Sequence, residues 1–154
     1  MQRPPQVDPK SLADYLDMMS RAIFSAGLSW KVIEAKWPGT RIAFDGFDPE
    51  TVAAYNPDDI ERLMVDPGVV HNRKKIEAVV ANAGELIVTE RDFGGIEKYL
   101  GSFETNEDLV KDLHKRFKFM GEFAAHYFLF GVKFNEDVQE KWALAQAEQM
   151  HEKG

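Results

Sequence analysis

Three consecutive basic residues follow a tight turn near the middle of the chain. The turn is the sequence DPG at 66–68, and two valines separate it from a helix that we expect to begin near His71. A glycine turn leaves backbone N–H groups exposed at the start of a helix, where they and the helix dipole favour a phosphate oxygen. We predict phosphate binding here, by the residues Gly68, Val70, Arg73, Lys74 and Lys75.

A second basic cluster, HKRFK at 114–118, could extend the same charge along a nucleic-acid backbone. Its candidate phosphate-binding residues are Lys115, Arg116 and Lys118. The turn at 66–68 and the basic residues after it also fit a plain connection between helices whose charges form a solvated face, and the sequence leaves that alternative open.

The stretch AGLSW at 26–30 places a glycine, an aliphatic residue and a large indole side by side. Gly27 allows close approach of another backbone, and Leu28 and Trp30 stand at the start of a predicted helix. The alternative is that Leu28 and Trp30 are core residues of that helix.

The elements that must position these residues are helices. Apolar residues recur at helical spacing through most of the chain, and Asp8-Pro9, Asp48-Pro49 and Asn56-Pro57 are typical helix starts. Further helices are predicted over 94–101, 106–116, 120–131 and 135–151, and the only short strand candidate is TRIAF at 40–44. We predict one compact all-α domain over 1–154, with a helical hairpin over 58–83 and a polar tail, 143–154, that frays.

Composition limits the classes of function. The chain has 154 residues, no cysteine and a net charge of −7, which excludes thiolate metal sites and argues against nucleic-acid binding by bulk charge. No apolar run is long enough for a membrane span and MQRPPQVDPK has no signal core, so we expect a cytoplasmic monomer.

Four segments in order resemble the DNA-3-methyladenine glycosylase I family of the helix-hairpin-helix DNA glycosylase superfamily. They lie at 26–30, 47–54, 59–83 and 114–121, and the similarity runs from Leu12 to Gly131. The resemblance implies a DNA base excision repair enzyme. Such an enzyme flips an alkylated purine such as 3-methyladenine out of double-stranded DNA and hydrolyses its glycosidic bond without a cofactor.

The resemblance also implies roles for the residues of AGLSW. Leu28 would fill the gap left by the flipped base, Gly27 would let the backbone approach the duplex, and Trp30 would contact the cationic base. Tyr127 would add a polar edge to the base pocket.

Two features of the family pattern are missing. The family places a pocket glutamate eight residues before the tryptophan, where this chain has Ala22. Glu122 becomes the candidate catalytic carboxylate, and the other possible replacements come from the first helix: Asp14, Tyr15 and Asp17. The family also holds a structural zinc with cysteine and histidine ligands at both ends, which a chain without cysteine cannot reproduce, and His126 is expected in or near the core. The sequence therefore leaves two alternatives to an active glycosylase: a damaged-DNA-binding module with weakened catalysis, and a helical protein with no role on DNA.

Overall fold

The computed structural model describes residues 4–153, and among them every regular element is helical. The elements are α1 (Leu12–Ser25), α2 (Trp30–Ala43), the short 3-10 helix η1 (Asp45–Phe47), α3 (Pro49–Ala53), α4 (Pro57–Val65), α5 (Arg73–Phe93), α6 (Ile96–Leu100), α7 (Asn106–Arg116), α8 (Glu122–Gly131) and α9 (Glu136–Lys153). The predicted all-α class is confirmed. The strand candidate at 40–44 is wrong, because α2 continues through Pro38 to Ala43.

Capping side chains fix where the helices begin. Asp48 and Asn56 cap α3 and α4, each followed by a proline at the start of the helix, as predicted. Asp8-Pro9 is not a helix start, since Ser11 caps α1 by accepting a hydrogen bond from the Asp14 N–H. Asn72 caps α5, so this helix begins at Arg73 and not at His71.

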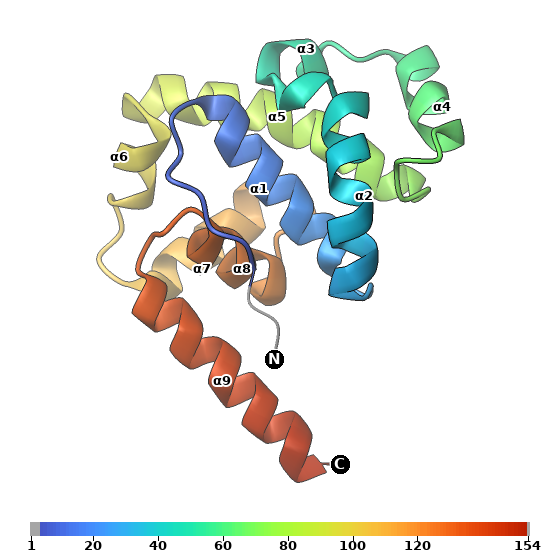
Figure 1. The fold of residues 1–154 in the computed structure, drawn as a ribbon. Helices are drawn as coiled ribbons and strands as arrows, with labels where there is room; N and C mark the ends of the chain where they lie inside the picture. Colours follow the sequence, from blue (N-terminus) through green and yellow to red (C-terminus); the bar gives the residue numbers. More distant parts are fainter. Residues whose placement is uncertain (1–3, 154) are drawn as a thin grey trace.

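Two long helices, α1 and α5, form the centre of the molecule (Figure 1). Helix α1 packs against α8, α5 and α2, and α5 packs against α3, α6 and α4. An aromatic stack joins α2 to the segment that follows it: the Phe47 ring lies 5.5 Å from Trp37 and 5.2 Å from Phe44, all three buried. The core therefore fixes α2, which carries Trp30 at its first position.

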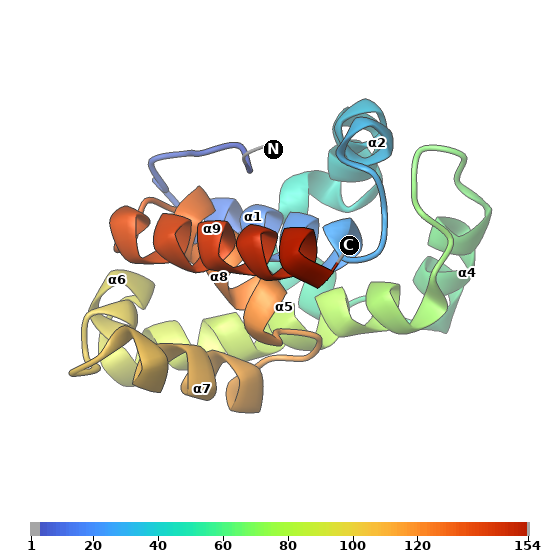
Figure 2. The same ribbon diagram turned by 90° about the horizontal axis from the view of Figure 1, so that it is seen from below.

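Helix α9 projects away from this body in Figure 1, and in the view from below it crosses in front of α8 (Figure 2). It packs against α8 and is helical as far as Lys153, so the fraying expected over 143–154 stays a prediction, and Gly154 lies outside the described residues. None of the helices in the described part of the chain has the length and apolar content needed to cross a bilayer.

Candidate nucleic-acid interface

The loop between α1 and α2 presents Leu28 and Trp30 to solvent. Gly27 has a φ of +84°, which favours glycine, and Ser29 caps α2 by accepting a hydrogen bond from the Val32 N–H. Leu28 is 41% exposed and Trp30 43% exposed. The alternative that these two side chains belong to the core is therefore wrong.

The hairpin between α4 and α5 is held by packing on the core and by a hydrogen bond within its own turn. Val69 is buried and Val70 packs against the core, as the sequence predicts. The N–H of Gly68, however, donates to Asp66 Oδ1 at 2.8 Å, so this group is not free for a phosphate as expected. The free donors lie further on, because the N–H groups in the first turn of a helix have no partner within it. In α5 these belong to Arg73 and Lys74, while Asn72 takes the N–H of Lys75.

Helix α2 holds the same hairpin from the other side. Lys36 Nζ donates to the carbonyl oxygen of Pro67 at 2.9 Å, and Thr40 Oγ1 donates to that of Gly68 at 2.7 Å. The backbones nearly touch, since a Cβ added to Gly39 would lie 3.3 Å from the Gly68 Cα. The Trp30 helix and the hairpin are therefore one rigid unit.

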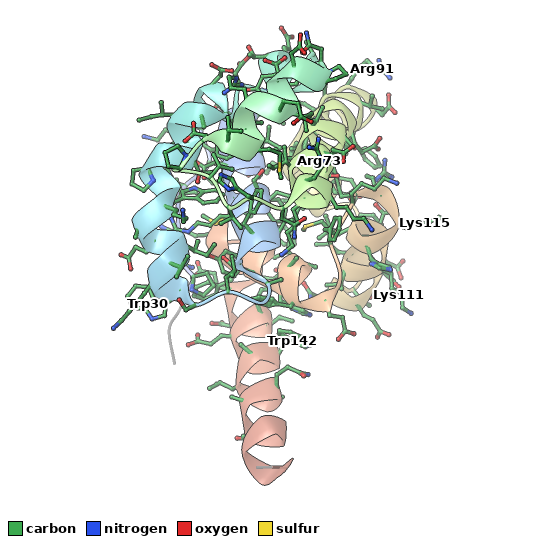
Figure 3. All side chains as sticks on the ribbon, turned by 90° about the vertical axis from the view of Figure 1, so that its right-hand side faces the viewer. Trp30, Arg73, Arg91, Lys111, Lys115 and Trp142 are labelled. Atoms are coloured by element: carbon green, nitrogen blue, oxygen red, sulfur yellow. The ribbon has the colours of Figure 1, made fainter. Side chains whose placement is uncertain are left out.

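A further contact joins the hairpin helix to the 26–30 loop. Lys75 Nζ donates to the carbonyl oxygen of Ala26 at 2.9 Å, and partial burial lowers the pKa of this lysine. Lys75 therefore holds the loop in place beside the start of α5 as well as adding charge. Figure 3 shows Trp30 and Arg73 in one view, at the starts of α2 and α5.

The basic residues of the first cluster have different surroundings. Arg73 pairs with Glu61 of α4 at 2.6 Å between Nη1 and Oε1, and this contact raises the pKa of Arg73 and lowers the pKa of Glu61. Lys74 is exposed. A phosphate would therefore meet Lys74 directly and would compete with Glu61 for Arg73.

The second cluster divides in two. Lys115 and Lys118 are exposed, and Lys115 appears at the edge of the view in Figure 3. Arg116 is not a free cation, because its guanidinium bonds to Asp112 at 2.8 Å and Glu85 at 3.4 Å and lies over the Tyr99 ring. Arg116 therefore has structural contacts within the fold, and its phosphate-binding role stays a prediction.

The residues predicted for the base pocket lie at the first position of α2 and on α8. Glu122 is exposed at the first position of α8, and half-buried Tyr127 packs edge-on against Phe123. Ala22 is completely buried in α1. A surface cavity of about 390 Å³ lies between α4 and α5, with Glu61 and Arg73 among its lining residues, and neither Trp30 nor Tyr127 lines it.

The residues present do not fit the zinc site that the family resemblance implies. The sequence has no cysteine, and within the described residues no group of three or more potential ligands could hold a metal. Buried Gln139 joins this region instead: its Oε1 lies 2.5 Å from His126 Nδ1, and its Nε2 donates to Asn106 Oδ1 at 2.8 Å. His126 is buried as predicted, which lowers its pKa, and its ring stacks on Trp142.

Hydrogen bonds also tie the N-terminal segment to this end of the molecule. The Val7 N–H donates to the Gly131 carbonyl at 2.8 Å, and Gln6 Nε2 donates to the Phe130 carbonyl and to Glu136. Polar contacts therefore tie the N-terminal segment to α8 and α9.

Sequence reasoning missed the side chains that position the interface. Lys36 and Thr40 look like ordinary helix-surface residues, and nothing in the sequence marks their reach to the hairpin. Asn82 could have been found from the sequence, because a polar residue in the apolar stripe of α5 indicates a buried side chain that needs hydrogen-bond partners. It is buried, and its side-chain amide bonds to both the N–H and the carbonyl of Lys118.

These features define a helix-hairpin-helix domain in which an exposed apolar loop is fastened to the hairpin. The chain belongs to the methyladenine glycosylase family, whose sequence pattern matches residues 5–126.

Individual relatives agree with that assignment. The chain is 32% identical over 106 residues to DNA-3-methyladenine glycosylase 1 of Escherichia coli strain K12, covering 69% of this chain and 55% of that protein. It is 29% identical over 109 residues to DNA-3-methyladenine glycosylase of Haemophilus influenzae strain Rd, covering 71% and 57%. The chain thus spans a little over half the length of these curated relatives.

A solved structure extends the similarity to the fold. The structure of 3-methyladenine DNA glycosylase I from Staphylococcus aureus, solved to explain 3-methyladenine recognition by that protein, superposes on this chain with a TM-score of 0.69. It is 34% identical in sequence, and the match covers 83% of this chain and 78% of that one.

Proposed function

We propose that this chain is a DNA repair N-glycosylase that removes alkylated purines such as 3-methyladenine from double-stranded DNA. The observation that carries the proposal is the fastening of the Leu28–Trp30 loop to the hairpin through Lys75, Lys36 and Thr40. An enzyme that flips a base must hold the backbone and fill the vacated space at a fixed separation. A rigid unit that carries both groups meets that requirement.

Recognition of the damaged base follows from the exposed indole. An N-alkylated purine is positively charged, so the face of Trp30 attracts it by stacking and cation–π interaction, worth roughly 1–2 kcal/mol when desolvated. Neutral adenine gains less. The indole therefore favours the cationic alkylated purine over neutral adenine.

The chemical step is hydrolysis of the bond between the sugar C1′ and the purine nitrogen. The bonding electrons leave with the cationic base, which becomes neutral, and a water oxygen bonds to C1′ and releases a proton to solvent. The carboxylate that would stabilise the positively charged sugar is proposed to be Glu122, which is exposed at the start of α8. A cytoplasmic, monomeric protein is the form we expect to carry out this reaction.

The second candidate is a module that binds damaged DNA without releasing a base. The observation that favours it is Ala22, which is buried at the place where the family resemblance implies a pocket glutamate. Such a module would bind a duplex containing an abasic site through the hairpin and form no product.

Base release from methylated duplex DNA tests the proposal. We expect the purified protein to release free 3-methyladenine, identified by mass spectrometry, faster than a heat-denatured sample of the same protein. Glu122→Gln should slow release without weakening binding to an abasic-site duplex. Binding with no release would replace the proposal by the second candidate, and absence of both would remove any role on DNA.

A further inference from the structure

Phe119 combines an exposed aromatic ring with an unfavourable backbone conformation. It lies in the turn between α7 and α8, has a φ of +58° and is 50% exposed. Bulky residues rarely adopt this left-handed conformation, which costs about 1–2 kcal/mol per residue and is normally left to glycine or asparagine. Strain of this kind collects at functional sites.

Packing accounts for the other phenylalanine with this conformation. Phe47 has a φ of +59°, but its ring is completely buried between Phe44 and Trp37. Burial of an aromatic side chain contributes more than the strain costs. The exposed ring of Phe119 gains no comparable burial, so the fold alone does not explain it.

The surrounding residues hold this turn in a fixed position. Phe117 and Met120, on either side, are buried in the core. Between them, the buried Asn82 side chain accepts from the Lys118 N–H at 2.8 Å and donates to the Lys118 carbonyl at 3.0 Å. Phe119 is therefore presented to solvent from a rigid support.

That support is shared with the Leu28 loop. Lys75, which binds the Ala26 carbonyl, and Asn82 are seven residues apart on α5, hence on one face and separated by about 10.5 Å along the axis. The Leu28 loop and the Phe119 turn are thus both bound by side chains on the same face of α5. Exposed Lys118 directly precedes Phe119 in the chain, and exposed Lys115 lies three residues before Lys118, so the segment that carries the ring is basic.

The geometry points to Phe119 as a second apolar contact with duplex DNA, packing against bases beside the gap that Leu28 fills. The inference rests on the proposed function for the identity of the partner. A basic flank suits the phosphates on either side, and an aromatic ring suits base faces left unstacked by flipping. The strained turn then aims the ring at the duplex and does not serve folding.

Replacing Phe119 by asparagine separates these roles. Asparagine tolerates the left-handed conformation and removes the ring. We expect Phe119→Asn to raise the unfolding temperature by about 2–4 °C. We also expect it to weaken binding to a duplex with an abasic-site analogue by about fivefold to 100-fold, measured by fluorescence anisotropy. Phe119→Ala should weaken binding equally without the gain in stability.

Leu144→Ala is the matched control, because Leu144 is also 50% exposed but lies on α9. The affinity of this variant for the duplex should equal that of the wild type. Unchanged affinity of both Phe119 variants, while the wild type binds and releases base, would overturn this inference alone. Loss of affinity in a protein that releases no base would uphold it and remove the catalytic proposal. A wild type that does not bind the duplex would overturn both.

Discussion

At the scale of single residues, the proposed site has an exposed indole and lacks an expected carboxylate. Trp30 is exposed at the start of α2, beside the loop that carries Leu28. Ala22 is enclosed in α1, and the neighbouring cation, Arg21, lies over the buried Trp37 ring. We therefore propose that the attraction for a cationic base comes from the indole and not from a charge at position 22.

The burial of Ala22 gives a test at this scale. A carboxylate placed there would be buried without a partner, so Ala22→Glu should lower the free energy of unfolding by about 3–5 kcal/mol. Urea denaturation measures this loss. Ala26→Glu, at an exposed position in the following loop, should stay within about 0.5 kcal/mol of the wild type. An unchanged midpoint for Ala22→Glu would mean that position 22 opens into a pocket.

Residue types indicated some of these roles and concealed others. The exposure of Leu28 and Trp30 agrees with the family resemblance, because a glycine with positive φ turns the loop outward. The pairing of Arg116 with Glu85 could not be predicted, since Glu85 lies on α5, whereas Asp112 is four residues earlier on the same helix as Arg116. Pairing between helices depends on tertiary packing, and a cluster of basic residues in the sequence does not indicate which helices pack together.

At the scale of helices, side-chain hydrogen bonds join separate elements at two junctions. One joins α2 to the hairpin through Lys36 and Thr40, and the other joins α7, α8 and α9 through Gln139. Capping signals predicted where α3 and α4 begin, because caps are local. They did not predict the second junction, whose three partners lie on separate helices and are brought together only by folding.

The second junction can be tested by removing its central amide. Gln139→Leu should lower the free energy of unfolding by about 1–3 kcal/mol, because Asn106 and His126 each lose a buried hydrogen-bond partner. Thermal unfolding measures this change. Gln146→Leu, half-buried on the same helix, should have an effect within about 0.5 kcal/mol.

A chelator provides the complementary control. Since Gln139 and the N-terminal hydrogen bonds hold this end of the molecule, excess EDTA should leave the unfolding temperature of the wild type unchanged. A fall in that temperature with EDTA, or no effect of Gln139→Leu, would contradict this description of the junction.

At the scale of the whole molecule, a net charge of −7 must be reconciled with the proposed DNA partner. Charges separated by more than about 8–10 Å are screened at physiological salt, so the local cations of the interface decide binding. Lys74, Lys115 and Lys118 are exposed, whereas Arg73 and Arg116 are paired with acidic side chains. Few free cations predict few phosphate contacts and a moderate dependence on salt.

Affinity for duplex DNA as a function of salt measures the number of those contacts. Each neutralised phosphate contributes about −0.9 to the slope of log affinity against log salt, so Lys74→Met should make the slope less steep by about that amount. Lys98→Met, at an exposed site on α6, should leave the slope unchanged. Identical slopes for the wild type and Lys74→Met would place DNA elsewhere on the surface.

The central claim is that the Trp30 indole receives the damaged base, and its most direct test is the single-turnover rate of 3-methyladenine release. Trp30→Ala should slow release by about 10- to 100-fold, and Trp30→Phe should recover most of the rate, because it keeps an aromatic face. Ile42→Ala, on the same helix and 80% exposed, should match the wild type. Equal rates for the wild type and Trp30→Ala would contradict the account.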